Sequence, residues 1–361
     1  MLAHRDSVTG RATALRFWTR SAALRYGMRR VLGTSAQSLE QAAVRKDVLC
    51  PSELRMVMPP RLSNEHAARV RRCALDEPVE GTLAKLLSPV QYDMPTVAYR
   101  LHAAMLDGKF LYSGMFKHDL ARCDPVQGSD FEWMETAVLT STFAGTQWFG
   151  HFLHDELPSQ LAAEMLAPLI GHARAPYLQE PGYRELFDLP RPSTVRRAFV
   201  EECILLHDVG LNSHKRARLD RMRERARRSG GGPQRIYFQR RDGHSRTLVN
   251  EERLVERLVT EGFTVVTPGD LDVKTLAQVC GAARIVVGVD GSHLYAPLLL
   301  LPPRAEVLVI MPPLRLATAG LQIAQAMDFN VSLFVAEVAA TKETFSVQED
   351  EFLRFVAQSR N

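Results

Sequence analysis

The sequence predicts an α/β protein in which parallel strands alternate with helices. Within residues 235–296 the spacing of apolar residues changes repeatedly between the period of a strand and that of a helix. Residues 236–238 alternate as in a strand, residues 254–259 recur on one helix face, and residues 285–287 form the unbroken apolar run of a buried strand. This order predicts a parallel sheet covered by helices, and such sheets bind ligands beyond the carboxyl ends of their strands.

The residues between these elements agree with the alternation. Asn250 and Asp272 are placed to cap two helices, and Gly262 can end the first of them in the left-handed conformation. Residues 263–266 are expected to form the strand between the helices. The remaining chain continues the pattern, with strands expected at residues 307–311 and 331–335 and helices at residues 316–327 and 346–358.

The chain before this stretch is less regular. Seven prolines lie within residues 48–134, and this density favours short strands and turns over long helices. Asp107 and Gly108 can form the two-residue turn of a hairpin that joins residues 98–106 to residues 109–112.

Two helices are expected between this region and the alternating stretch. One runs from Trp148 to Ile170. The other lies in the basic run HKRARLDRMRERARRSGGGP and is interpreted as a solvated helix leading to a linker. The run lacks the interleaved aromatic residues that stack on bases, so nucleic acid is not expected as a partner. The chain is long enough for two domains. The expected order is a basic extension at 1–47, an α/β domain at 48–228, a linker at 229–234, a Rossmann-like domain at 235–340 and a terminal helix at 341–361.

Composition excludes several classes of protein. The net charge is only +4, so charge alone does not indicate nucleic acid binding, and no apolar run reaches the ~18 residues of a membrane span. The five cysteines are widely spaced and form no CxxC pair, which is typical of buried free thiols in a reducing compartment. A cytoplasmic location is therefore expected.

The first 39 residues are rich in arginine and contain a single acidic residue, Asp6. As a helix they would be basic and amphipathic, which suits peripheral contact with an anionic membrane. An organelle transit peptide or a solvated terminal extension fits the same composition. The segment has no hydrophobic signal-peptide core, so secretion is not expected.

His151 and Asp155 are the first candidate catalytic residues. They are four residues apart and would share one helix face. A carboxylate beside an imidazole suits general-base chemistry, and Asp155 could also orient the ring. The alternatives are that the pair only pins the helix, or that His151, His154 and Asp155 hold a metal, for which no further ligand cluster is evident.

The second set of candidates lies at the ends of the predicted parallel strands. Arg240, Arg241 and Arg246 follow the first strand, and arginine binds phosphate oxygens through two hydrogen bonds. The turn that includes Asp290, Gly291 and Ser292 follows a later strand and can present backbone amides to an anion. A surface set of ion pairs with Asp242, Glu251 and Glu252, and a plain strand-to-helix turn, are the alternatives.

Two runs of sequence resemble glycosyltransferase family 61. The run YFQRRDGHSRTLVNEERLVERLVTEGFTVV, followed by ARIVVGVDGSHL, is similar to the family's Y-S-R-R, later R, N-E and V-G-P-H-G-A-G-L pattern. Upstream, WFGHFLHDELPSQL resembles the family's N-Y-x-H-W-x-x-D-x-L-P helix. The chain departs from the pattern at Val289 to Ser292, where the family has P-H-G-A, and at Thr275 and Leu276, where it has E-Q.

The resemblance implies two facing Rossmann-like domains, the GT-B type of glycosyltransferase architecture. It implies transfer of a sugar from a nucleotide-diphosphate donor, most simply uridine-linked, to a hydroxyl of a glycan, lipid-linked or protein acceptor. The reaction would invert the anomeric carbon and require neither a metal nor a cofactor. Asp155 with His151 would be the base, and the donor would be bound by Arg240, Arg241, Arg246, Asn250, Asp290, Gly291, Ser292 and His293. A catalytically inactive binding or scaffold protein is the alternative; a serine hydrolase is disfavoured because no GxSxG elbow is present.

Overall fold

The computed structural model describes residues 26–28, 31, 35–120, 131–226, 231–240, 246–341 and 343–358. The chain divides into two compact units, and each unit is assembled from segments that are far apart in the sequence. Unit 1 contains the described residues of Met1–Ser52, Met94–Tyr177 and Pro190–Lys215. Unit 2 contains those of Glu53–Asp93, Leu178–Leu189 and Arg216–Asn361. The units therefore interleave along the chain, whereas the sequence suggested domains that follow one another.

Unit 2 is built on the parallel sheet that the sequence predicted. Its order is β13-β11-β14-β15-β16, and all four pairings are parallel. The strands are β11 (Arg235–Phe238), β13 (Thr264–Val266), β14 (Ile285–Val289), β15 (Glu306–Met311) and β16 (Asn330–Val335). The order along the sheet reverses between β11 and β14, and ligands bind at such switch points in open α/β sheets.

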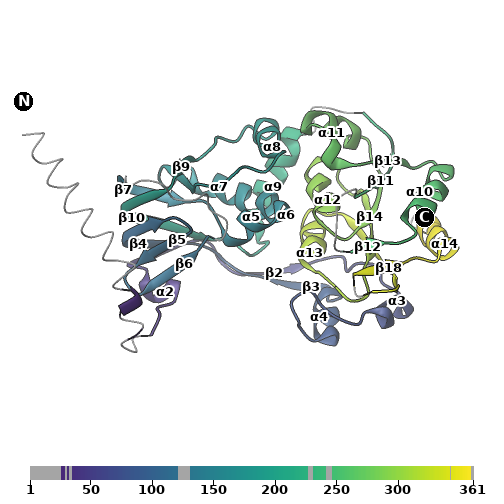
Figure 1. Ribbon diagram of the computed structural model, residues 1–361, viewed down its shortest axis with the longest axis horizontal. Helices are drawn as coiled ribbons and strands as arrows, with labels where there is room; N and C mark the ends of the chain where they lie inside the picture. The colour runs from purple at the N-terminus through teal and green to yellow at the C-terminus, as the bar shows by residue number, and fades with distance from the viewer. Residues whose placement is uncertain are drawn as a thin grey trace, which may run out of the picture. The chain divides into compact units, whose positions relative to one another are not determined.

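Helices cover both faces of this sheet (Figure 1). One face packs on α10 (Glu251–Thr260) and α14 (Glu349–Gln358). The other faces α11 (Val273–Cys280), α12 (Ser292–Tyr295), the 3₁₀ turn Ala296–Leu300 and α13 (Ala319–Ala326). Tyr237, Phe334 and Phe352 are fully buried in the shared core. The terminal helix α14 thus packs on unit 2.

The predicted helix ends are only partly correct. Asp272 caps α11, because its Oδ1 accepts a hydrogen bond from the Thr275 amide at 2.9 Å. Gly262 follows α10 with φ +83°, as a left-handed end requires. Asn250 precedes α10 but makes no side-chain cap. Its amide instead donates to Val347 O and Glu349 Oε1, each at 2.8 Å.

The segment 53–93 joins unit 2, although the sequence placed it in the first domain. It contains β2 (Glu53–Met56), α3 (Asn64–Arg69), α4 (Val79–Leu86) and β3 (Val90–Asp93). Arg61 bridges to Ser332 on the edge strand β16, and Arg69 of α3 pairs with Glu351 of α14 at 2.8 Å. A further small sheet in unit 2 pairs β12 (Thr247–Leu248), β18 (Thr344–Ser346) and β17 (Glu337–Val338). Such long-range edge pairing leaves no periodic signal in a sequence.

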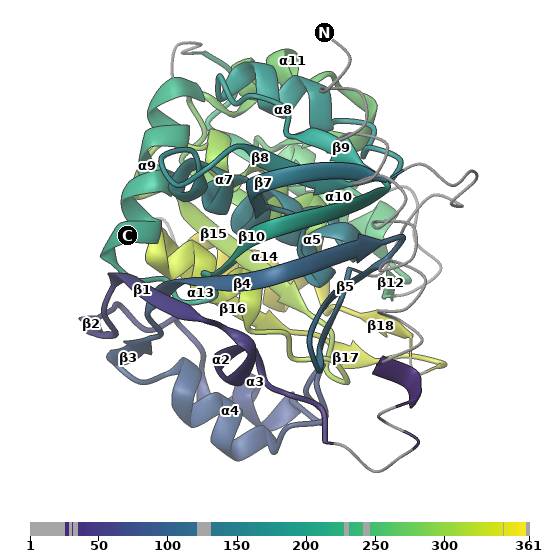
Figure 2. The same cartoon turned by 90° about the vertical axis from the view of Figure 1, so that its left-hand side faces the viewer.

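Unit 1 contains a mixed sheet of eight strands, ordered β6-β5-β4-β10-β7-β8-β9 with β1 also paired to β4 (Figure 2). The strands are β1 (Arg45–Cys50), β4 (Thr96–Asp107), β5 (Phe110–Ser113), β6 (Phe116–Asp119), β7 (Glu132–Leu139), β8 (Leu169–His172), β9 (Ser193–Val195) and β10 (Arg197–His207). Strands β7 to β10 are parallel to one another, and β4 is antiparallel to β10. The predicted hairpin is confirmed, but its turn is Gly108 and Lys109, because Asp107 pairs with Phe110.

The expected helix from Trp148 to Ile170 is divided. The structure has α5 (Phe143–Gln147), α6 (Phe149–His151), a π-helical turn (Phe152–Glu156) and α7 (Leu157–Ala163), after which β8 begins. The Leu157 amide donates to Phe152 O, five residues earlier. Pro158 has no amide hydrogen to donate to the preceding turn, which disfavours regular α-helical bonding here. Such π turns occur often at functional sites.

The basic run is a helix, α9 (Ser213–Ala226), but it is not solvated as expected. Lys215, Leu219, Met222 and Arg223 are buried. In unit 2, Arg223 donates to Met327 O at 3.1 Å and lies over the ring of Phe329. Some cationic residues of α9 therefore lie in the interior, where Lys215 pairs with a carboxylate and Arg223 with a carbonyl and an aromatic ring.

Several expectations fall on residues that are not described. They concern most of the N-terminal basic segment, Cys123, Arg227, Arg228, Arg241 and Asp242. Cys50, Cys73, Cys203 and Cys280 are buried free thiols, as predicted. Within the described ranges, no helix combines the length and apolar character needed to cross a bilayer.

Candidate functional site

The His151 and Asp155 pair is formed in unit 1. His151 ends α6, Asp155 lies in the π turn, and Nδ1 of the imidazole is 2.6 Å from Oδ2 of the carboxylate. Both side chains are partly exposed, at 35% for His151 and 27% for Asp155. The arrangement has the geometry of an imidazole oriented by a carboxylate, which is one way to prepare a general base.

Lys215 is a third member of this cluster that the sequence reasoning missed. Its side chain is fully buried, and Nζ is 2.6 Å from Oδ1 of Asp155 and 2.9 Å from the backbone oxygen of Asp208. The signal was present, because Lys215 lies at helical spacing from the apolar Leu219 and Met222. A lysine on the apolar face of a helix is rarely buried without a charged partner.

The charges around Asp155 decide its protonation. Burial raises the pKa of Asp155, but the ammonium of Lys215 and the hydrogen bonds from His151 and Lys215 outweigh this and hold the pKa well below its usual range. Asp155 is therefore a carboxylate at neutral pH and a weak base by itself. Since a carboxylate can only accept hydrogen bonds, Nδ1 of His151 is the donor, and Nε2 is left to bind a proton.

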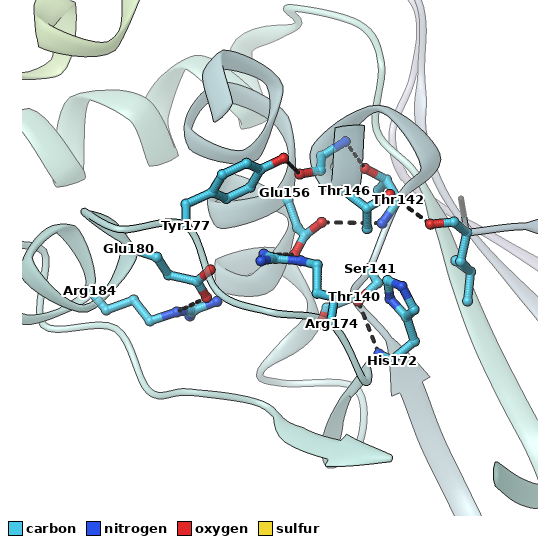
Figure 3. Close-up of polar contacts among 12 residues, drawn as sticks. Thr140, Ser141, Thr142, Thr146, Glu156, His172, Arg174, Tyr177, Glu180 and Arg184 are labelled. Atoms are coloured by element: carbon cyan, nitrogen blue, oxygen red, sulfur yellow. Dashed lines mark hydrogen bonds and ion pairs between the residues drawn. The ribbon is translucent and has the colours of Figure 1, made fainter. Parts of the chain in front are cut away.

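A set of buried polar contacts connects the π turn to the neighbouring loops (Figure 3). Glu156 is 2% exposed; its Oε2 accepts from the Thr142 amide at 3.2 Å, and its Oε1 is 3.8 Å from the guanidinium of Arg174. The Tyr177 hydroxyl donates to Gly145 O at 2.9 Å. A Cβ at Gly145 would lie 2.5 Å from the Glu156 carboxylate, so this close packing requires glycine.

Two aromatic side chains next to His151 are exposed. Trp148 is 53% exposed and Phe143 is 45% exposed. The rings of Trp148 and His151 have centroids 5.6 Å apart, and the Phe143 ring stands edge-on to Trp148. The exposed indole of Trp148 thus lies beside the imidazole and can contact a ligand that approaches His151.

The geometry does not support the metal alternative for HFLHD. His154 is buried, at 1% exposure. Across the part of the chain that the structure covers, no three His, Cys, Asp or Glu side chains are grouped to hold a metal ion.

A separate pocket of about 250 Å³ lies in unit 2, beyond the carboxyl ends of strands β11, β13 and β14. It is therefore at the switch point of the parallel sheet. Its lining residues are Gln239, Arg240, Arg246, Thr267, Pro268, Gly269, Asp270, Ser292 and His293. Arg240, Arg246, Ser292 and His293 were predicted for this site, whereas Gln239 and residues 267–270 were missed because they resemble an ordinary loop.

The carboxylate of Asp290 is buried and has two side-chain partners. It is 1% exposed, with Oδ2 3.2 Å from Nη1 of Arg246 and Oδ1 accepting from the Tyr295 hydroxyl at 2.9 Å. Burial raises the pKa of Asp290, and Arg246 opposes that rise. The carboxylate therefore positions Arg246, and Arg246 pairs with Asp290 and not with Glu251 or Glu252 as the alternative assumed.

His293 brings an uncharged imidazole to the same pocket. Burial, together with the nearby Arg240 and Arg246, lowers the pKa of His293 to about 3. Its Nε2 is buried and makes no hydrogen bond within the described residues. Arg240 and Arg246 line the pocket together with the carboxylate of Asp270, and the two guanidinium groups can donate hydrogen bonds to an anionic ligand.

The remaining predicted residues separate into two groups. Gly291 has φ +152°, and a Cβ there would meet Nδ1 of His293 at 3.2 Å and Nη1 of Arg246 at 3.4 Å, so it shapes the pocket wall. Asn250 is not among the lining residues and ties α10 to Val347 and Glu349. The helix α12 is only four residues long, so the anion site expected at its N-terminus has little dipole to draw on.

The sequence model of the family described as Glycosyltransferase 61 matches residues 149–308, which include the π turn, α9 and the pocket strands. These residues are similar to glycosyltransferase family 61. The resemblance seen in the two motifs is thereby confirmed, and this match implies glycosyltransferase activity in general. Such activity implies a sugar donor and an acceptor. None of the curated proteins matches the chain.

Proposed function

We propose that this protein transfers a sugar from a nucleotide-diphosphate donor to a hydroxyl group, with inversion at the anomeric carbon and without a metal ion. The observation that carries the proposal is the 2.6 Å contact between His151 and an Asp155 carboxylate that Lys215 keeps ionised. The contact supplies an imidazole oriented by a carboxylate, which a hydroxyl nucleophile needs and a simple nucleotide-binding protein does not.

The donor's diphosphate would bind in the pocket of unit 2. Arg240 and Arg246 would bind its oxygens and stabilise the charge that grows on the leaving group. His293, being uncharged, would add a hydrogen bond without adding to the charge. A uridine diphosphate sugar is the donor we propose to test first.

In the proposed reaction, Nε2 of His151 takes the proton of the acceptor hydroxyl as its oxygen attacks the anomeric carbon. The bond from that carbon to the diphosphate oxygen breaks, and its electron pair leaves with the diphosphate. Attack from the face opposite the leaving group gives inversion. In this proposal His151 is the base and Asp155 its orienting partner, because so strongly paired a carboxylate is a poor proton acceptor.

The two facing Rossmann-like domains, the cytoplasmic location and a peripheral membrane contact through the basic N-terminal segment belong to the same proposal. The parallel sheet of unit 2 supports the first of them. The proposed acceptor is a hydroxyl of a glycan, a lipid-linked molecule or a protein, so acceptors of all three classes belong in the assay.

The test is calorimetric titration of the full chain with uridine, guanosine, adenosine and cytidine diphosphates and their sugar conjugates, with and without a chelator. We expect chelator-resistant binding of one nucleotide, loss of binding in Arg240→Ala, and retained binding without turnover in His151→Gln. Binding without turnover by the wild type would instead identify an inactive binding protein. No binding to any nucleotide would refute the proposed donor class.

A further inference from the structure

Lys215 is a buried charge that takes no direct part in the proposed proton transfer. Its side chain is 0% exposed, so it cannot touch either substrate. Its ammonium lies 2.6 Å from Oδ1 of Asp155 and 2.9 Å from Asp208 O. Burying an ammonium costs several kcal/mol of free energy unless it is paired and hydrogen-bonded. The burial of Lys215 therefore depends on its contacts with Asp155 and Asp208.

The backbone around Lys215 fixes its position. Its amide donates to Oδ1 of Asn212 at 3.1 Å, which caps the first turn of α9. The Asn212 amide group donates to Met94 O and to the Thr96 hydroxyl, each at 2.9 Å. The helix start is thereby tied to the beginning of β4, and Lys215 has little freedom to move away from Asp155.

Two acidic residues of unit 1 contact this ammonium. Asp155 faces it from the π turn, and His151 contacts the far oxygen of that carboxylate. Asp208, after β10, offers its backbone oxygen to Lys215, while its carboxylate accepts from Thr96 and Ser159 at 2.7 and 2.9 Å. The Asp208 carboxylate is thus already committed to two hydroxyls, and Asp155 is the acid that Lys215 neutralises.

We propose that Lys215 is a positioning residue for the base, an inference that rests on the function proposed above. Its ammonium occupies Oδ1 of Asp155 and keeps that group a carboxylate, so that Oδ2 can only accept the Nδ1 proton of His151. The imidazole is then held as the tautomer whose bare Nε2 takes the acceptor proton. Lys215 acts only through Asp155 and makes no contact with the reacting atoms.

The charge balance gives the expected direction of a pH effect. Lysine and aspartate cancel, so the imidazolium formed during the reaction has no net counter-charge. Removing the ammonium leaves one negative charge beside His151 and favours the imidazolium. The acid limb of the rate profile, which reports loss of neutral His151, should therefore move to higher pH by about one unit.

The first experiment needs no substrate. In ¹⁵N NMR of the full chain at neutral pH, with His151 assigned through His151→Gln, we expect a protonated Nδ1 and a bare Nε2. In Lys215→Met we expect this preference to be lost, either to mixed tautomers or to imidazolium. Lys46→Met is the matched control, because it removes a lysine of unit 1 whose ion pair with Glu40 is exposed, and it should leave the spectrum unchanged.

The second experiment is the pH profile of kcat/KM for sugar transfer. We expect Lys215→Met to shift the acid limb upward and Lys215→Arg to restore it towards the wild type. A wild-type His151 with its proton on Nε2 would overturn the inference even if Lys215→Met did not fold. An unchanged tautomer and acid limb in folded Lys215→Met would reduce Lys215 to a structural role. The tautomer is measured without donor or acceptor. The inference about Lys215 can therefore fail while the proposed function stands, and the proposed function can fail while the inference about Lys215 stands.

Discussion

Arg246 and Asp290 are joined across the end of β14 by two contacts from one guanidinium nitrogen. Nη1 of Arg246 is 3.1 Å from the backbone oxygen of Asp290 and 3.2 Å from its Oδ2. Arg246 itself has φ +66°, a conformation that an arginine rarely adopts without support. The pair thus fixes both the backbone and the side chain of a pocket cation, with 21% of the arginine side chain left exposed.

Asp290→Ala should therefore destabilise the protein and weaken its donor site. The change leaves the Arg246 guanidinium and the Tyr295 hydroxyl without their acceptor in the interior, which should cost about 2–4 kcal/mol of unfolding free energy. Urea denaturation measures the cost, and nucleotide titration measures affinity. Asp270→Ala, at a carboxylate that lines the same pocket, is the control. An unchanged denaturation midpoint in Asp290→Ala would show that the pair contributes nothing.

Gly291→Ala should reduce nucleotide affinity more than glycine replacement elsewhere in the pocket. The new Cβ would lie 3.2 Å from His293 and 3.4 Å from Arg246, at a φ of +152°, and the backbone strain alone should cost about 1–3 kcal/mol. Gly269 also lines the pocket but has open space around its Cβ position. Gly269→Ala should bind nucleotide as the wild type does. Equal affinities in the two variants would contradict the close packing at Gly291.

The parallel sheet of unit 2 could be predicted because its strands and helices are local. Val286 and Val287 form a buried run, and Asp272 caps the preceding helix, α11, through its own side chain. Both signals lie within a few residues, where periodicity and capping chemistry act. The assignment of 53–93 to unit 2 depends on Arg61 pairing with Ser332, and no local pattern encodes a contact between residues so far apart.

The residues of the candidate sites could likewise be predicted only where the signal is local in the sequence. His151 and Asp155 were found because four-residue spacing places them on one face. Lys215 lies 60 positions further on, in a run whose many arginines concealed that one lysine continues an apolar stripe. Asp290 was identified in the correct turn, but its pairing with Tyr295 and Arg246 could not be read from composition. Charge partners between separate elements are set by the fold.

His293 should make the protein sensitive to mild acid. Its pKa in the folded state is about 3, below the ~6.5 of an exposed histidine. A depressed histidine pKa means that the unfolded chain binds the proton first, so stability is lost as pH falls below ~6.5. Between pH 7 and pH 5 this should cost about 2 kcal/mol. His293→Gln should lose less over that range in urea denaturation, whereas His102→Gln, at an exposed position, should behave as the wild type. Parallel losses in wild type and His293→Gln would refute the assignment.

Trp148→Ala should weaken acceptor binding while sparing the donor. The exposed indole lies beside the His151 ring, so a molecule that offers its hydroxyl to His151 can stack on it. Stacking on an aromatic face is worth about 1 kcal/mol, which corresponds to a roughly fivefold rise in KM for the acceptor. Nucleotide affinity measured by calorimetry, and hydrolysis of the donor without acceptor, should not change, because the donor pocket is lined by other residues. Trp133→Ala is the matched control, since this residue is also partly exposed, at 44%, but lies on strand β7. If both variants raised the acceptor KM equally, the effect would reflect a general loss of exposed tryptophan and not a wall beside the base.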